Sequence, residues 1–382
     1  MVLVSPLFTG FTSRWKRRHF CLIIRARQIM YLRFALFPLI AISLFGQSPT
    51  PIAQKPDVAP NSQPSSSANQ GPPPIQVQVN EVIVPVTVTD EKGRFVSDLD
   101  QKDFTIFEEG KQQEIQFFTR ERSQPVVVGF LVDLSNASRL HWKNYQDAAV
   151  ELVQNLIPGD NPKFSGYLIG YSNTADLLLD TATDPEPMVQ KLQKMKPSGG
   201  AALYDAIYMA CTSRKLIQGE PIEPRRILVI IGDGHDNASK KTLDEALEIA
   251  QRNLVTIYGV STVAFGFANQ DAKNLVRLAE ETGGRVEYPL EDVFKDVAGF
   301  ISTPSDEGNY PLKVGTGLYA AELANGMYRA VEAVVGEVTT QYIIRYVPNS
   351  TDAKKQFRDI EVKVNLSNVK VRARKGYYPF AP

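Results

Sequence analysis

Apolar and polar residues alternate in two separate parts of the chain. Between residues 75 and 88 nearly every second side chain is apolar, and short apolar runs at 104–107 and 115–118 flank a Glu-Glu-Gly-Lys turn. A period of two is typical of half-buried β-strands. Similar patterns return near the C-terminus, at 342–346, 360–364 and 369–373. Because neither group can close a stable domain alone, we predict that residues 75–122 and 339–382 pair into one antiparallel β-sandwich.

The pattern between these two regions is different, because continuous apolar runs alternate there with amphipathic stretches. Residues 126–132 are entirely apolar or glycine, which is typical of a strand buried on both faces of a parallel sheet. Further strands are predicted at 164–171, 176–180, 227–232 and 256–265, and helices near 185–195, 202–216, 242–253 and 271–282. The fold class indicated for residues 125–300 is therefore α/β, with a doubly wound, mostly parallel sheet flanked by helices. Residues 301–338 are predicted to be a loop followed by an amphipathic helix.

The first 74 residues follow neither pattern. Residues 1–46 contain seven basic and no acidic residues and end in a 13-residue apolar run, whereas a membrane-spanning helix needs about 20 residues. We predict a secretory signal peptide over 1–46, with Met30 as an alternative initiator; an uncleaved membrane anchor is the competing interpretation. Residues 47–74 hold eight prolines and no aromatic residue, which predicts a disordered Pro/Ser-rich linker.

The leader predicts where the protein is located, and the charge of the rest of the chain limits the class of partner. We expect a secreted, periplasmic or cell-envelope protein without stable membrane insertion after signal cleavage. The full chain has 42 basic and 42 acidic residues, so the part that follows the leader has 35 basic against 42 acidic residues. A net negative body argues against nucleic acid as the main partner. Only Cys211 would remain after cleavage, which excludes an internal disulfide.

Three polar segments lie next to predicted strands and helices of the α/β region. Asp133-Leu134-Ser135-Asn136-Ala137-Ser138 follows one strand, Ser198-Gly199-Gly200-Ala201 precedes a helix, and Asp233-Gly234-His235-Asp236-Asn237 follows another strand. In order and spacing they resemble the three loops of a von Willebrand factor type A domain. The segments Val84-Pro85-Val86 and Arg374-Lys375-Gly376-Tyr377-Tyr378 also resemble the exported VWFA-related proteins of acidobacteria.

The resemblance implies a metal-ion-dependent adhesion site. Mg²⁺ takes about six oxygen ligands. In this family they come from Asp-x-Ser-x-Ser, a Thr and an Asp on successive loops, and one position is left for a partner's carboxylate. Asp133, Ser135 and Asp233 stand at three of these ligand positions, whereas Ala137 and Ala201 stand where the second Ser and the Thr are expected. The site is therefore partly degenerate, and we expect weak binding of Mg²⁺ or another divalent cation.

Two interpretations of this incomplete site stay open. In the first, water or a neighbouring side chain replaces the lost hydroxyls, although Ser138 comes one residue too late in the motif. The neighbouring candidates are Ser138, Ser198, His235 and Asp236. In the second, Asp133 and Asp233 only accept hydrogen bonds from backbone N–H groups, and the site is inert.

The sequence offers little for catalysis. It contains neither a Gly-x-Ser-x-Gly elbow nor a phosphate-binding Gly-x-x-x-x-Gly-Lys-Ser/Thr loop, and Gly315-Thr316-Gly317 fits a dinucleotide fingerprint only superficially. We therefore predict no enzyme, but an exported protein that mediates protein–protein interaction or adhesion by binding an acidic residue of its partner. The alternatives are a structural or assembly protein of the cell envelope with an inert metal site, and an Asp-based hydrolase.

Overall fold

The computed structural model describes residues 81–120, 125–213, 216, 224–262, 270–289, 318–349 and 357–379. The predicted signal peptide and linker, and the segment Gly315–Gly317, lie outside these described residues. Residues 75–382 form one compact unit. Among the described residues, no helix combines the length and the apolar character that crossing a membrane requires.

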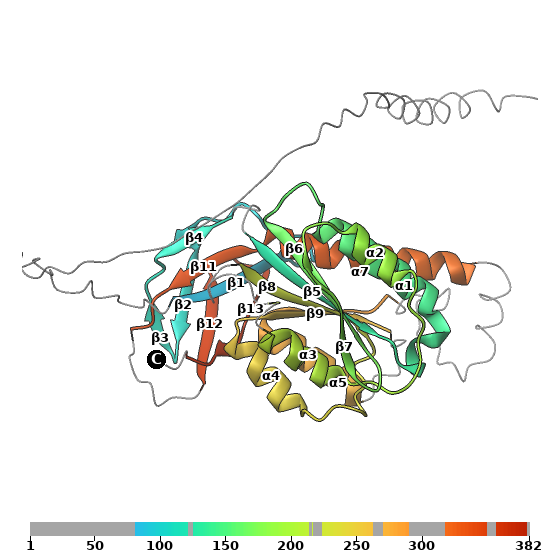
Figure 1. Ribbon diagram of the computed structural model, residues 1–382. Coiled ribbons are helices and arrows are strands. Elements are labelled where there is room, and N and C mark those ends of the chain that lie inside the picture. Colours follow the sequence, from blue (N-terminus) through green and yellow to red (C-terminus); the bar gives the residue numbers. More distant parts are fainter. Residues whose placement is uncertain are drawn as a thin grey trace, which may run out of the picture. The chain divides into compact units, whose positions relative to one another are not determined.

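A six-stranded sheet forms the centre of the α/β region (Figure 1). Its strand order is β10 (Val286–Glu287), β9 (Thr256–Ser261), β8 (Arg225–Gly232), β5 (Val126–Asp133), β6 (Phe164–Tyr171) and β7 (Ala175–Ala182). All neighbouring strands are parallel except β6 and β7, which are antiparallel. Strands β5 and β8 are therefore parallel neighbours in the middle of the sheet, and their carboxyl ends lie side by side.

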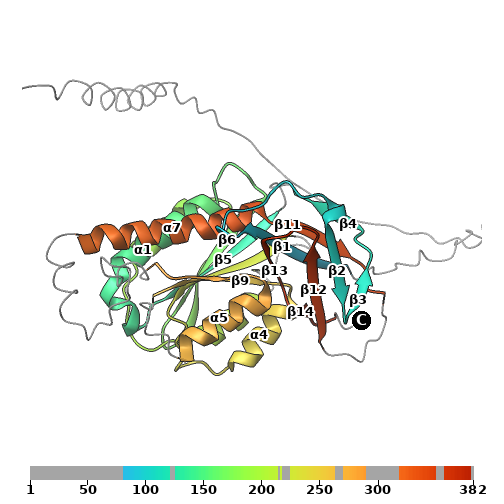
Figure 2. The ribbon, with the colours of Figure 1, turned by 180° about the vertical axis from the view of Figure 1, so that it is seen from behind.

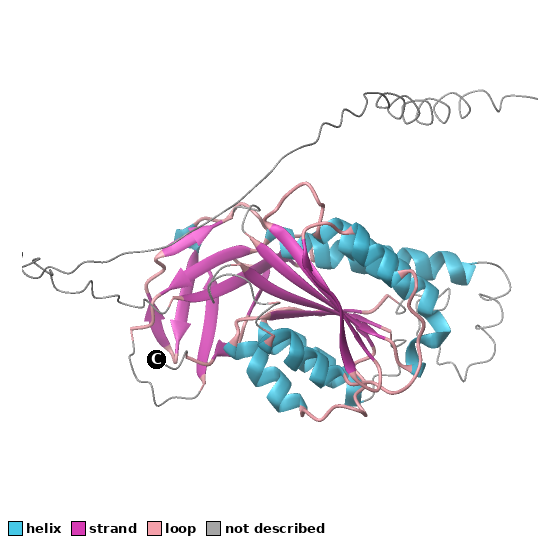
Figure 3. Ribbon diagram, in the orientation of Figure 1, coloured by secondary structure: helices cyan, strands magenta, loops and turns pink. Residues whose placement is uncertain are grey.

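Helices cover both faces of this sheet (Figure 3). One face packs against α1 (Trp142–Leu156), α2 (Glu186–Leu192) and α7 (Leu318–Thr340), and the other against α3 (Leu203–Thr212), α4 (Leu243–Arg252) and α5 (Gln270–Thr282). Strand β5 is buried along its whole length, because Val128 and Phe130 pack into the first core and Val127 and Leu131 into the second. Burial on both faces explains the continuous apolar run in the sequence.

The remaining strands form two antiparallel sheets. One has the order β13 (Val369–Ala373), β1 (Val82–Asp90), β11 (Tyr342–Tyr346) and β4 (Phe117–Thr119). The other has the order β14 (Gly376–Tyr377), β12 (Arg358–Val364), β2 (Phe104–Glu108) and β3 (Lys111–Gln113), with the short 3₁₀ helix η1 (Gln101–Asp103) before β2. Both sheets contribute to a single apolar core. Tyr346 of the first sheet donates a hydrogen bond to Glu108 of the second at 2.8 Å.

The predicted fold class is confirmed. Strand β1 lies between two C-terminal strands, since Val84 pairs with Ile344 of β11 and Val88 with Val371 of β13. The antiparallel sheets are thus built from both ends of the described chain, with the α/β region between them in sequence. The view from behind shows the strands of these sheets beside the α/β region, with α7 and α5 on opposite sides of the central sheet (Figure 2). The boundaries of the predicted regions stay predictions.

Candidate functional site

The candidate site is built from loops at the carboxyl ends of β5 and β8. Val132 and Ile231 are paired on these parallel strands, so the strands deliver Asp133 and the segment Gly232-Asp233 to the same place. Gly232 is needed there, because a Cβ atom at this position would lie 2.9 Å from the Cβ of Asp133 and would also collide with the Tyr171 hydroxyl. The structure therefore brings Asp133 and Asp233 together, and it adds Tyr171 at the end of β6.

Asp133 is almost completely buried, with 1% of its surface exposed. Its Oδ1 accepts a hydrogen bond of 2.7 Å from the N–H of Ser135, whereas its Oδ2 has no partner among the described residues. Burial raises the pKa of this carboxyl to about 6. The hydrogen bond from the Ser135 N–H lowers the pKa in part, whereas the negative charge of Asp233 raises it further. The fold thus buries a carboxylate of which only one oxygen accepts a well-formed hydrogen bond among the described residues.

Asp233 is half-buried and similarly placed. Its Oδ1 accepts a hydrogen bond of 2.8 Å from the N–H of His235. The pKa of Asp233 is raised, mainly by burial. The ring of His235 turns towards α5, where its Nδ1 lies 2.9 Å from Oδ2 of Asp271, and this contact is the main reason why the pKa of the imidazole is raised. His235 is therefore engaged with Asp271.

Three buried hydroxyls accompany the two aspartates. Ser135 and Ser138 are each 3% exposed and Tyr171 is 1% exposed, and none of the three hydroxyl oxygens makes a well-formed hydrogen bond among the described residues. The hydroxyls of Ser135 and Ser138 lie beside the Asp133 carboxyl as weak donors, which lowers its pKa. The pKa of Tyr171 is raised by burial first and then by the negative charges of Asp133, Asp233 and Asp236.

These oxygens fit a hard divalent cation. Buried polar groups nearly always have partners, so a carboxylate oxygen and neighbouring hydroxyls left unpaired call for an explanation. Carboxylate and hydroxyl oxygens are the ligands that Mg²⁺ prefers. The described residues contain no group of three or more His, Cys, Asp or Glu side chains placed to hold a metal ion. Any cation here would therefore depend on serine hydroxyls and water as well as on carboxylates.

The two alanines of the motif have different surroundings. Ala137 is exposed, whereas Ala201 is completely buried. The backbone of Ala201 is held on both sides by the third loop: its N–H donates to Oδ1 of Asn237 at 2.8 Å, and its carbonyl accepts from the N–H groups of Asn237 and Ala238 at 3.0 Å. Asn173 fixes the neighbouring Gly200 N–H in the same way at 2.7 Å.

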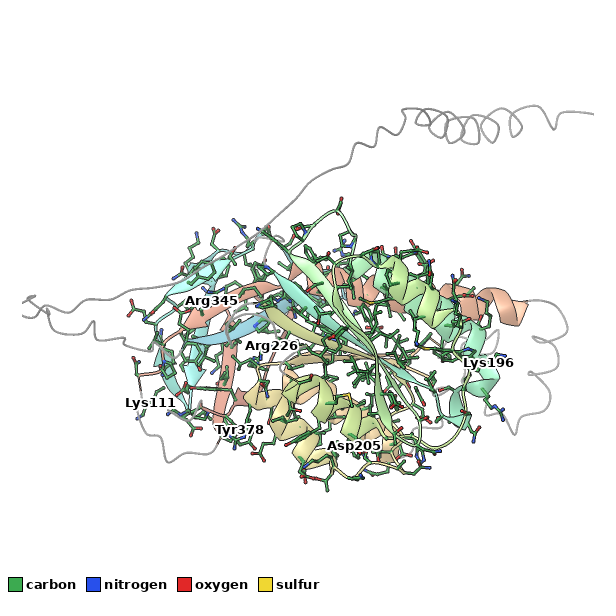
Figure 4. All side chains as sticks on the ribbon, in the orientation of Figure 1. Lys111, Lys196, Asp205, Arg226, Arg345 and Tyr378 are labelled. Carbon is green, nitrogen blue, oxygen red and sulfur yellow. The ribbon has the colours of Figure 1, made fainter. Side chains whose placement is uncertain are left out.

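Asp236 connects the third loop to α3, and both of its carboxylate oxygens accept hydrogen bonds. Its Oδ2 accepts hydrogen bonds from the N–H of Tyr204, in the first turn of α3, at 2.9 Å and from the Ser239 hydroxyl at 2.6 Å. In return, Asp205 of α3, labelled in Figure 4, accepts from the N–H groups of Lys240 and Lys241. A carboxylate at a helix N-terminus is stabilised by the helix dipole, so this arrangement explains the third loop's acidic residue without a metal.

Sequence reasoning placed Asp133, Ser135 and Asp233 on adjoining loops, and the structure brings these loops together. Of the four candidate replacement ligands, Asp236 and His235 have other partners, and Ser198 is exposed. Sequence reasoning missed Asn173, Asn237 and Tyr171. For Asn237 the enrichment of Asn, Asp and Ser in the third loop was the available signal, but it does not identify which long-range hydrogen bonds form. Tyr171 and Asn173 lie outside the three loops and carried no such signal.

Family comparison agrees with this architecture. Residues 128–299 match the family model described as "von Willebrand factor type A domain". This part of the chain has the fold of a von Willebrand A domain, which confirms the resemblance at the level of the domain. Domains of this kind are typically interaction or adhesion modules, and they often bind a divalent metal ion. Comparison with curated proteins gave no match.

Three similar solved structures can be compared with the chain. The vWF domain of the type V pili tip protein Mfa5 from Porphyromonas gingivalis is 19% identical over 29% of this chain and 38% of that chain, with a TM-score of 0.25. The conserved hypothetical protein BatB from Bacteroides thetaiotaomicron is 18% identical over 56% and 97%, with a TM-score of 0.32. Proximal thread matrix protein 1 from the mussel byssus, with a zinc-occupied MIDAS motif, is 14% identical over 60% and 49%, with a TM-score of 0.38. The chain thus spans well under two thirds of the first and third of these structures.

Proposed function

We propose that the protein is an exported, non-enzymatic binding module that recognises another protein through the loops at the carboxyl ends of β5 and β8. The observation that carries this proposal is the set of unpaired buried oxygens of Asp133 and Ser135 beside Asp233. These three side chains would hold a divalent cation such as Mg²⁺, in a partly degenerate adhesion site. A bound cation would supply positive charge at the surface, where water positions could be exchanged for an acidic residue of the partner.

The export part of the proposal rests on the sequence of the first 74 residues. A short apolar run after a basic segment, followed by a Pro/Ser-rich stretch, is expected to be cleaved near Gly46. The mature protein would then be secreted, periplasmic or held at the cell envelope. N-terminal sequencing of the extracytoplasmic protein tests this, and a membrane-bound chain that begins at Met1 or Met30 would contradict it.

A capture experiment tests the interaction itself. The intact protein is immobilised beside the double variant Asp133→Asn/Asp233→Asn and exposed to envelope extract with Mg²⁺ or with EDTA. A matched control is Asp180→Asn, which changes an exposed aspartate on β7. We expect proteins retained by the wild type and the control to be lost with the double variant and with EDTA.

Retention of the same proteins by the double variant would contradict the proposal. It would favour the alternative of a structural or assembly role in which the antiparallel sheets make the contacts. A hydrolase would be recognised by turnover that disappears in Asp133→Asn. Because the double variant changes one buried and one half-buried carboxyl, its thermal unfolding is measured in parallel to establish that it is folded.

A further inference from the structure

We propose that Ser138, in place of residue 137, supplies the second serine hydroxyl of the cation site, so that the first loop binds through Asp133, Ser135 and Ser138. The proposal rests on the proposed function, because it assigns a ligand to the same site. It differs from the motif's register by one residue. The spacing of the motif points to Ala137, whose methyl group has no oxygen to offer.

Local backbone geometry places Ser135 and Ser138 on one side of the loop. The chain enters the 3₁₀ helix η2 (Asn136–His141) directly after Ser135, and the N–H of Ser138 donates to the carbonyl of Ser135 at 3.3 Å. A 3₁₀ helix has three residues per turn, so side chains three positions apart lie above one another. The observed burial follows this period, because Ser135 and Ser138 are buried whereas Asn136 and Ala137 are exposed.

The Ser138 hydroxyl has the properties expected of a ligand that lacks its cation. It is nearly inaccessible to solvent, makes no well-formed hydrogen bond among the described residues and lies beside the Asp133 carboxyl as a weak donor at most. A buried hydroxyl whose hydrogen bonding is incomplete is unfavourable, and a cation bound by both this hydroxyl and the carboxylate would satisfy the two groups. Ser135 shows the same combination of burial and missing partner at an expected ligand position.

Mn²⁺ binding measures the contribution of each serine directly. Free Mn²⁺ is titrated by electron paramagnetic resonance against the full-length wild type and four variants: Ser138→Ala, Ser135→Ala, Ala137→Ser and Ser138→Ala/Ala137→Ser. Ser97→Ala is the matched control, because Ser97 is an exposed serine that belongs to none of the three loops. We expect Ser138→Ala to weaken binding at least about tenfold, as Ser135→Ala does, because each removes one oxygen from the site. The control and Ala137→Ser should bind as the wild type does, and Ala137→Ser should not rescue Ser138→Ala.

Thermal unfolding gives a second readout that a structural serine would not produce. With EDTA, Ser138→Ala should lower the melting temperature only slightly, because it removes at most a weak donor to the Asp133 carboxyl. With saturating Mn²⁺ the same variant should melt much further below the wild type, since the stabilisation by a ligand depends on its affinity. A loss of melting temperature that is equally large under both conditions would indicate a structural serine and would overturn the proposal.

The remaining outcomes separate this proposal from the proposed function. Unchanged Mn²⁺ binding in Ser138→Ala, or rescue by Ala137→Ser, overturns the role of Ser138 and leaves the cation-dependent interaction intact. Absence of Mn²⁺ binding in the wild type overturns Ser138 as a ligand together with the cation part of the proposed function. In that case the capture experiment with and without EDTA still decides whether the loop face binds a protein.

Discussion

Asp133 and Asp233 repel one another in the metal-free protein. For Asp133, the folded-state pKa of about 6 lies above its ordinary value of 3.8, chiefly because the carboxyl is buried. The folded state therefore binds more protons than the unfolded state between about pH 4 and pH 6, and the free energy of unfolding falls as the pH rises through this window. Two pKa units correspond to about 3 kcal/mol, a penalty that is fully developed above pH 6. A bound cation would offset it.

Asp133→Asn should therefore stabilise the metal-free protein at neutral pH. The amide oxygen can still accept the hydrogen bond from the Ser135 N–H, while the buried charge is removed. We expect the free energy of unfolding to rise by about 2 kcal/mol at pH 7.5 and to change little at pH 4, where the wild-type carboxyl is already protonated. Urea denaturation in EDTA at both pH values measures this. An Asp133→Asn variant less stable than the wild type at pH 7.5 would show that the carboxylate is stabilised by a partner; Asp180→Asn serves as the exposed control.

Ala201→Thr should act differently from Ala137→Ser. The Ala201 backbone is already fixed by Asn237, so a threonine there would add its hydroxyl to a preorganised loop. We expect Mn²⁺ affinity to rise about tenfold, because an oxygen ligand would replace a water. Since Ala201 is completely buried, the extra atoms should also lower the metal-free stability by about 1–3 kcal/mol. Calorimetric titration and urea denaturation measure the two effects. Unchanged Mn²⁺ affinity would show that residue 201 does not face the site.

The sequence predicted which loops meet, but not how each side chain is used. Asp133 and Asp233 follow buried strands, and neighbouring parallel strands necessarily bring such residues together. Whether Ser138 or Ala137 faces Asp133 depends on the 3₁₀ turn after Ser135, which the spacing of the motif does not encode. The role of Asn237 depends on a contact with a residue 36 positions away, so no local pattern could reveal it.

Helix α7 is joined to one of the antiparallel sheets by a buried carboxylate. Glu337 is completely buried, and its oxygens lie 3.0 Å from Nη1 of Arg372 on β13, 3.0 Å from Nε of Arg285 before β10, and 3.0 Å from the hydroxyl of Thr87 on β1. Tyr258 of β9 donates a further, longer hydrogen bond. One side chain thus contacts strands of the central sheet and strands of an antiparallel sheet.

Removing this carboxylate should be strongly destabilising. Glu337→Ala leaves Arg372 without this carboxylate, whereas Arg285 keeps Glu287 at 2.6 Å. Because both arginines are partly exposed, we expect a loss of about 3 kcal/mol, the low end of the range for a buried ion pair broken from one side. Glu337→Gln keeps the shape and part of the hydrogen bonding, so its loss should be smaller, about 1–3 kcal/mol. Urea denaturation measures both. Glu332→Ala, an exposed glutamate on the same helix, should change stability by less than about 0.5 kcal/mol. Equal effects of the variants at 337 and 332 would show that the cluster adds no stability.

The nested arrangement of the chain was predictable from hydrophobic periodicity, whereas its strand order was not. Alternation at 82–88 and again at 342–346 and 369–373 indicated strands with one buried face, and the lack of enough partners in either group required that they pair with each other. The position of β1 between β11 and β13 depends on which apolar faces fit together in one core, for example Val84 beside Ile344. The amphipathic helix predicted within 301–338 is described as α7, and its apolar side completes the core on one face of the central sheet.

Deleting residues 341–382 should unfold the N-terminal strands while leaving the α/β region largely folded. The deletion keeps α7 complete but removes both neighbours of β1 and the inner neighbour of β2. Backbone groups of β1 would lose their hydrogen-bond partners, and its buried valines would lose the core formed with Tyr342 and Ile344. Hydrogen exchange followed by mass spectrometry should show rapid exchange in peptides covering 82–90 and 104–108. Peptides covering 126–133 should stay protected, because β5 lies between β6 and β8. A protected 82–90 segment in the truncated chain would mean that the N-terminal strands fold without the C-terminal ones, and pairing between the two ends would then not be what stabilises them.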